Sequence, residues 1–153
     1  MATTTVTRYI HSPRSSIFRA LIDPVLLVQW RFPEGMTAEV HTFDPRAGGR
    51  YRMSLTYKDP TSGTGKTSAA TDTFQGRFVE ISADERVVEA IRFEAEDPRF
   101  TGEMRMTTEL ADAADGTRVT ITCADIPSGI RPEDNAEGSR MALANLARLV
   151  EQG

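Results

Sequence analysis

The stretch IRPEDNAEGSRMALANLARLVEQG, residues 130–153, predicts one long helix. Pro132 suits the first turn of a helix, where a backbone N–H has no partner within the helix. The acidic residues Glu133 and Asp134 suit the positive end of the helix dipole. No proline interrupts the sequence from there to Gln152. About 20 residues can therefore form a helix roughly 30 Å long.

On a helical wheel this segment has one apolar face. The centre and flanks of that face are formed by Leu143, Leu146 and Val150 with Ala142, Ala147 and Leu149. The far side carries the polar residues Arg140, Asn145, Arg148 and Glu151. A helix with this pattern is stable when its apolar face is buried against another element.

The chain before this helix alternates in the manner of β-strands. Strands are expected at 3–12, 36–43, 50–57, 73–81, 86–95, 103–110 and 117–125. The turns between them are short, which favours antiparallel hairpins. Gly48 and Gly49 permit positive φ in the turn at 44–49, and Gly76, within a strand, indicates a bend or bulge.

Two short helices are expected between the first and second strands, at 12–22 and 23–30. Ser12 can cap the first of them and Pro13 can occupy its first position. Asp23-Pro24 ends that helix and begins the next. The natural fold packs the long helix against the concave face of a curved antiparallel sheet, so the class is α+β. We expect one domain over residues 1–153.

Composition excludes several classes of function. The 153 residues contain 18 Lys and Arg against 22 Asp and Glu, a net charge of -4, so nucleic-acid binding is not expected. No apolar stretch suggests a signal peptide or a membrane span, so we expect a cytoplasmic protein without a membrane partner. The single Cys123 allows no internal disulfide and is interpreted as a small buried side chain.

Cofactor and metal motifs are weak. Gly65-Lys66-Thr67 ends like a P-loop, but Pro60 stands where that motif needs its first glycine, and a strand follows instead of a helix. We interpret the segment as a hairpin loop. His11 and His41 are the only histidines and have no metal-ligand spacing. We therefore expect no cofactor and no metal.

Six short motifs, in order, resemble the activator of heat-shock protein 90 ATPase homologue-like family of the SRPBCC superfamily. They are SPRSSIFRALIDPVLLVQW, FPEGM, DPRAGGRYRM, FQGRFVEI, DGTRVTIT and PEDNAEGSRMALANLARLVE. The resemblance spans essentially the whole chain. It implies the helix-grip fold, also called START-like or Bet v-like, in which six or seven strands wrap around the long C-terminal helix. Asp44 and Arg46 of the DPRAGG motif are interpreted as turn-stabilising.

One departure from the family is informative. The family commonly has Gly-Trp early in the last helix, whereas this chain has Gly138-Ser139. Residue 139 aligns with the buried stripe, so a large aromatic is replaced by a small hydroxyl on the face toward the sheet. We expect a larger or more polar cavity mouth near Ser139 than in relatives with tryptophan.

The resemblance implies a cavity between the long helix and the sheet, and a single helix cannot fill the concavity of such a sheet. The function we expect is binding of a small hydrophobic or aromatic ligand there. Candidate ligand-binding residues are Trp30, Tyr51, Met53, Phe74, Phe78, Met104, Met106, Ser139 and Leu143.

Two other functions stay open. An enzyme of the cyclase or hydrolase type would use the same cavity, but no catalytic pair is identifiable in the sequence. A co-chaperone-like module is suggested by the family name. Full activators carry an additional N-terminal domain that this sequence does not contain, which argues against a chaperone partner. The family often pairs into dimers, and the sequence leaves both a homodimer and a monomer open.

Overall fold

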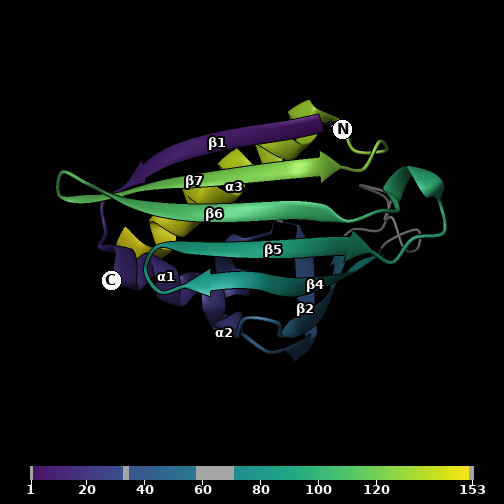
Figure 1. The fold of residues 1–153 in the computed structure, drawn as a ribbon, viewed down its shortest axis with the longest axis horizontal. Helices are drawn as coiled ribbons and strands as arrows, with labels where there is room; N and C mark the ends of the chain where they lie inside the picture. The colour runs from purple at the N-terminus through teal and green to yellow at the C-terminus, as the bar shows by residue number, and fades with distance from the viewer. Residues whose placement is uncertain (1, 33–34, 58–70, 152–153) are drawn as a thin grey trace.

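Seven antiparallel strands form one sheet, and a long helix crosses it (Figure 1). The computed structural model describes residues 2–32, 35–57 and 71–151, so the Gly-Lys-Thr segment at 65–67 lies outside the described residues. The strands are β1 (Ala2–Ile10), β2 (Met36–Phe43), β3 (Arg50–Tyr57), β4 (Thr71–Ser82), β5 (Arg86–Phe93), β6 (Met104–Ala113) and β7 (Gly116–Ile126). Their order in the sheet is β1-β7-β6-β5-β4-β3-β2. The predicted α+β helix-grip class is confirmed.

The long helix α3 (Pro132–Glu151) begins and ends close to the predicted positions. Its buried residues are Ser139, Ala142, Leu143, Leu146 and Ala147, which confirms most of the predicted apolar face. Asn145 was wrongly expected on the solvent side. Its side chain is half-buried and donates from Nδ2 to the Trp30 carbonyl at 3.3 Å.

The short helices are α1 (Arg14–Ile22) and α2 (Pro24–Trp30). The prediction that Ser12 caps α1 was wrong, because Pro13 occupies the cap position and no side chain makes a cap hydrogen bond. Ser12 is buried instead, and its carbonyl accepts a bond from Thr117 Oγ1 at 2.8 Å. The predicted break at Asp23-Pro24 is confirmed, and the Asp23 carboxylate caps α2.

Three irregularities in strand register occur along the sheet, in β1, β2 and β4. Bulges of this kind bend a strand and increase its twist, which helps the sheet to curve. The one in β4 lies between Phe78 and Glu80, so the prediction of a bulge at Gly76 was wrong. Gly76 pairs regularly with Tyr51 on β3, and the Tyr51 ring lies over it. A Cβ at position 76 would stand 1.9 Å from Tyr51 Cζ.

The turn from Asp44 to Gly49 confirms the predicted roles of Asp44, Arg46 and Gly48, whereas Gly49 does not have a positive φ. Gly48 has a φ of +83°, and its N–H donates to the Phe78 carbonyl at 2.8 Å. The Arg46 guanidinium donates from Nε to the Asp44 carboxylate at 2.8 Å. The β6–β7 turn is shorter than the predicted 111–116, because strand pairing continues to Ala113 and resumes at Gly116.

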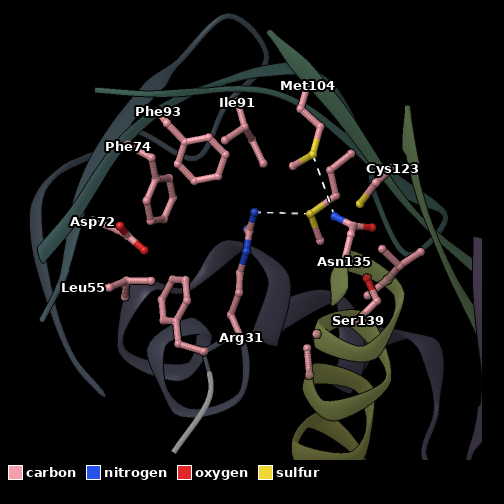
Figure 2. Close-up of a pocket in the computed structure, with 15 residues that line it drawn as sticks. Arg31, Leu55, Asp72, Phe74, Ile91, Phe93, Met104, Cys123, Asn135 and Ser139 are labelled. Carbon is pink, nitrogen blue, oxygen red and sulfur yellow. Dashed lines mark hydrogen bonds between the residues drawn. The ribbon is translucent and has the colours of Figure 1, made fainter. Parts of the chain in front are cut away.

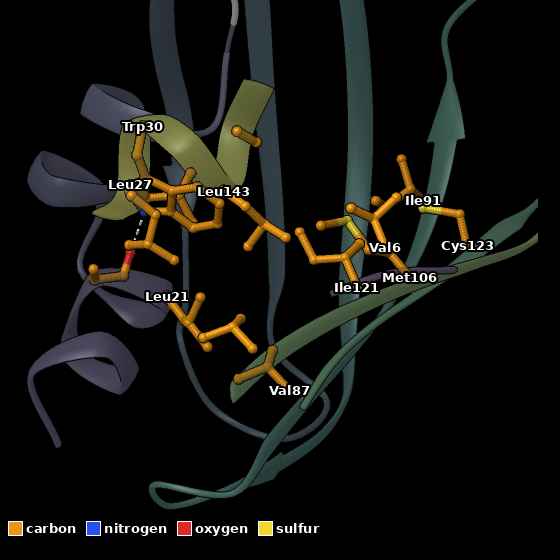
Figure 3. Close-up of a cluster of buried hydrophobic side chains, with 14 of the residues drawn as sticks. Val6, Leu21, Leu27, Trp30, Val87, Ile91, Met106, Ile121, Cys123 and Leu143 are labelled. Carbon is orange, nitrogen blue, oxygen red and sulfur yellow. Dashed lines mark hydrogen bonds between the residues drawn. The ribbon is translucent and has the colours of Figure 1, made fainter. Parts of the chain in front are cut away.

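One hydrophobic cluster lies between the sheet and the three helices. Figure 3 shows Trp30, Leu27 and Leu143 grouped where α2 meets α3, while Ile121 and Cys123 extend the cluster along the sheet. The Trp30 indole N–H donates to the Ala20 carbonyl at 2.9 Å, which ties α2 to α1. Within 2–32, 35–57 and 71–151, no helix has the length and apolarity needed to cross a membrane.

Candidate functional site

A cavity of about 250 Å³ lies between the first half of α3 and the sheet (Figure 2). Strands β3 to β7 form its roof and the segment after α2 closes one side. The second half of α3, with Leu143, Leu146 and Ala147, is packed into the core instead. The lining consists of Arg31, Phe32, Leu55, Asp72, Phe74, Ile91, Phe93, Met104, Met106, Ile121, Cys123, Asn135, Gly138, Ser139 and Ala142.

Two periodicities bring these side chains together. Along the strands, alternate residues face the same side, so Met104 and Met106 on β6 both reach the cavity. Along α3, Asn135, Ser139 and Ala142 recur at intervals of four and three residues and share one face. The cavity is therefore lined by alternate residues of the strands on one side and by one face of α3 on the other.

One wall of the cavity is aromatic. The Phe74 ring meets Phe32 edge-on with centroids 6.0 Å apart, and it meets Phe93 at 6.2 Å. Rings in this arrangement present both faces and edges to a guest molecule. This wall presents flat aromatic surface to the cavity.

A buried ion pair lies next to this wall. Arg31 Nη1 donates to Glu89 Oε1 at 2.8 Å, and the side chains are only 9% and 5% exposed. Tyr51 donates its hydroxyl to the same carboxylate oxygen at 2.6 Å. Burial disfavours the charge on Arg31, but the Glu89 carboxylate outweighs it and raises the Arg31 pKa above its ordinary value. Glu89 thus fixes a permanent cation at the cavity wall.

Two N–H donors of the lining face methionine sulfurs. Arg31 Nη2 lies 3.3 Å from Met106 Sδ, and Asn135 Nδ2 lies 4.0 Å from Met104 Sδ. Figure 2 shows both contacts as dashed lines, with the Arg31 guanidinium in the middle of the ring of lining side chains. The Asn135 carbonyl oxygen also accepts a bond from Thr4 on β1, which orients the amide.

Cys123 lines the cavity from β7 and is buried, as its sequence context predicted. Burial raises the pKa of its thiol, and nearby Asn135, Arg31 and Ser139 offset this only partly. A protonated thiol is a poor nucleophile. Cys123 therefore contributes apolar surface to the lining.

The nine candidate ligand-binding residues divide into two groups. Phe74, Met104, Met106 and Ser139 line the cavity. The other five are buried in the surrounding core without lining it, and they are Trp30, Tyr51, Met53, Phe78 and Leu143.

Sequence reasoning missed Arg31, Asp72 and Asn135, which are the main polar residues of the lining. One signal was available: Glu89 interrupts the apolar run Val87 to Ile91 and, once buried, needs a cation. That cation is Arg31, one residue beyond the end of α2.

The Tyr51 hydroxyl gives the first testable prediction. Burial raises its pKa well above the usual value, and the negative charge of Glu89 raises it further, while Arg31 opposes the shift. A raised folded-state pKa stabilises the fold fully below the unfolded pKa of about 10, and this contribution is lost as the pH rises beyond it. We expect the free energy of unfolding to fall above pH 10, with a smaller slope in Tyr51→Phe. Urea unfolding at pH 9 to 11 tests this, and identical slopes would contradict it.

A family model described as Activator of Hsp90 ATPase homolog 1-like protein matches residues 11–151. The chain belongs to this family. The match covers both short helices, the strands β2 to β7 and the whole of α3. The resemblance of the six sequence motifs is thereby confirmed. Among functionally curated proteins, none matches the chain.

Solved structures of similar proteins share the fold of this Activator of Hsp90 ATPase homolog 1-like chain. A crystal structure of a Chromobacterium violaceum protein is 32% identical over 97% of this chain and 96% of its own, with a TM-score of 0.87. One from Rhizobium loti is 27% identical over 97% and 96%, with a TM-score of 0.74. An NMR structure from Aeromonas hydrophila, titled as an AHSA1-like protein, is 19% identical over 99% and 93%, with a TM-score of 0.72. This last likeness shows the fold alone.

Proposed function

We propose that the protein binds a small hydrophobic or aromatic ligand in the cavity under the first half of α3. Proteins of this fold commonly bind hydrophobic ligands. The observation that carries the proposal is the cavity itself, about 250 Å³ with a predominantly apolar lining in a family member. A concave apolar site with a few convergent polar groups is the usual form of a small-molecule site.

Ser139 offers a direct test, because it is buried and lines the cavity, and the family resemblance implies a tryptophan at this position. In Ser139→Trp the indole would occupy the mouth of the cavity. We expect the affinity for prodan, a neutral and environment-sensitive naphthalene dye, to fall at least about tenfold, since the lost apolar contact area is worth more than 1.4 kcal/mol. Fluorescence titration measures this change.

Arg140→Trp is the matched control, since Arg140 is exposed on the same helix and carries the new indole into solvent. This variant should bind prodan like the wild type. Equal affinities of Ser139→Trp and Arg140→Trp would contradict the cavity as the binding site, and no saturable prodan binding by wild type would count against the function. Native mass spectrometry of the purified protein provides a second readout, the mass of any co-purified compound and the number of subunits.

A catalytic use of the same cavity is the second candidate. It is supported by the buried Asp72 carboxyl in the lining, since a carboxylate in an apolar site can act as a general acid or base. An enzyme of this kind would change the mass of a bound compound on incubation, and Asp72→Asn would abolish that change. Unchanged ligand after long incubation with wild type favours simple binding.

A co-chaperone-like module finds less support. It needs an apolar surface outside the cavity. In the part of the chain that the structure describes, the large apolar side chains with the most exposure are Tyr9, Val25 and Met141. Each comes from a different element, and single exposed apolar residues are ordinary on globular proteins.

A further inference from the structure

We propose that the cavity selects a neutral compound of one or two rings that carries a carbonyl oxygen, and that Arg31 Nη2 donates a hydrogen bond to this oxygen. The proposal rests on the ligand-binding function proposed above and names the chemical class of the ligand. Three observations lead to it. They are the weak hydrogen-bond acceptors of Arg31 and Asn135, the charge around Arg31, and the volume of the cavity.

The donors of the lining are matched with weak acceptors. Arg31 Nη2 and Asn135 Nδ2 face the thioether sulfurs of Met106 and Met104 at 3.3 and 4.0 Å. A thioether accepts hydrogen bonds poorly, whereas a carbonyl oxygen is a strong acceptor. Methionine side chains are unbranched and flexible, so they can adopt another rotamer beside a ligand. A ligand oxygen would therefore replace the sulfur as partner of a donor that is already in position.

Glu89 gives Arg31 its position. The carboxylate of Glu89 holds Nη1 at 2.8 Å, and Tyr51 holds the same carboxylate at 2.6 Å. Because the guanidinium is planar, fixing Nη1 also fixes the direction of Nη2. The ligand thus meets a donor with little remaining freedom, which reduces the entropy cost of the bond.

The local charge favours a neutral oxygen over a carboxylate. Arg31 is the one cationic side chain among the described residues of the lining, and Glu89 already compensates it. A ligand carboxylate would bring a further negative charge into a buried site without a new cation, and such burial is costly. A ketone, ester or amide takes the hydrogen bond without that cost.

The volume sets the size of the ligand. An apolar cavity of about 150 Å³ accommodates benzene. The present cavity of about 250 Å³ has room for a second fused ring. The edge-on pair of Phe74 with Phe32 and the tilted pair of Phe74 with Phe93 present aromatic surfaces to such a bicyclic compound.

Three ligands of nearly equal shape test the proposal by isothermal titration calorimetry at pH 7.5. They are 1-tetralone with a ketone, tetralin without oxygen, and 1,2,3,4-tetrahydro-1-naphthoate with a carboxylate. A hydrogen bond to a charged donor predicts that tetralone binds roughly tenfold more tightly than tetralin. The carboxylate should bind at least tenfold more weakly than tetralone. Equal binding of tetralone and tetralin, or tightest binding of the carboxylate, would overturn the proposal and leave the binding function intact. Binding of none of the three would overturn both.

A charge-neutral variant assigns the preference to Arg31. In Arg31→Met/Glu89→Gln no ion is left unpaired, and the amide oxygen at position 89 can still accept the Tyr51 hydroxyl. We expect the ratio of tetralone affinity to tetralin affinity to fall to about one, because neither ligand then meets a charged donor at position 31. Arg8→Met, which changes an exposed arginine on β1, should keep the full preference. A preference that survives in the double variant would contradict the role of Arg31.

Infrared spectroscopy gives a readout on the wild type that does not depend on the folding of a variant. The stretch of ¹³C-labelled tetralone carbonyl should move to lower frequency on binding, relative to its value in a hydrocarbon solvent, because the guanidinium polarises the C=O bond. A stretch at the hydrocarbon value would show an oxygen without a hydrogen-bond donor and would overturn the proposal.

Discussion

Arg31→Met is expected to lower the free energy of unfolding by about 3–5 kcal/mol, because it removes one partner of a buried ion pair. The Glu89 carboxylate would remain in the core with 5% of its side chain exposed, and the Tyr51 hydroxyl would be its remaining side-chain donor among the residues that the structure describes. Urea denaturation followed by the fluorescence of Trp30, the only tryptophan, measures the change.

A double variant separates the effect of the unpaired charge on stability from the effect of lost side-chain packing. Arg31→Met/Glu89→Gln removes both charges, and we expect it to recover most of the stability that the single variant loses. A surface pair provides the contrast: Arg52 and Glu94 are bridged at 2.7 Å but are 44% and 28% exposed. Arg52→Met should therefore have a much smaller effect, because solvent screens that pair. If Arg31→Met lowers the free energy of unfolding as little as Arg52→Met does, water must reach the Glu89 carboxylate.

Gly76→Ala is expected to cost about 3 kcal/mol, at the upper end of the range for overpacking a core. The new methyl would stand 1.9 Å from Tyr51 Cζ and 2.3 Å from its hydroxyl oxygen. The ring cannot move away easily, because it is buried and its hydroxyl is bonded to Glu89. Thermal or urea unfolding gives the value.

Two variants sharpen this prediction. In a Tyr51→Leu background the ring is gone, so Gly76→Ala should cost less than about 1 kcal/mol, and the difference is the coupling energy of the pair. Gly138→Ala is the matched control, since a Cβ there meets no atom within 4 Å and the position is helical. It should stabilise the protein by roughly 1 kcal/mol. Equal costs of Gly76→Ala in both backgrounds would exclude the Tyr51 ring as the cause.

Most of the fold could be predicted from the sequence because its signals are local. Strand alternation located all seven strands, and a proline with two acidic residues located the start of α3. The errors concern tertiary contacts. A bulge at Gly76 was one of the two interpretations of this glycine, whereas the strand pairs regularly there and the missing side chain makes room for the Tyr51 ring from the neighbouring strand. Ser12 was interpreted as the cap of α1. It is instead held against β7, where the Thr117 hydroxyl donates a hydrogen bond to its carbonyl oxygen.

The site was less predictable for a different physical reason. Alternation and helical spacing identify which side chains face inward, and Met104, Met106, Phe74 and Ser139 all do so. They do not say whether an inward side chain borders a void or another side chain, because that depends on how far the sheet curves away from α3. Trp30 faces inward equally well and lies in solid packing.

The division of α3 into two halves has a consequence for how this protein can diversify. The second half of α3 is close-packed in the core through Leu143, Leu146 and Ala147. The first half borders the cavity with Asn135, Gly138 and Ser139. Substitutions at the hollow end change the shape of the cavity and leave the packing at the other end unchanged. A lineage of such proteins can therefore reshape this cavity by altering two or three positions on about one turn of the helix.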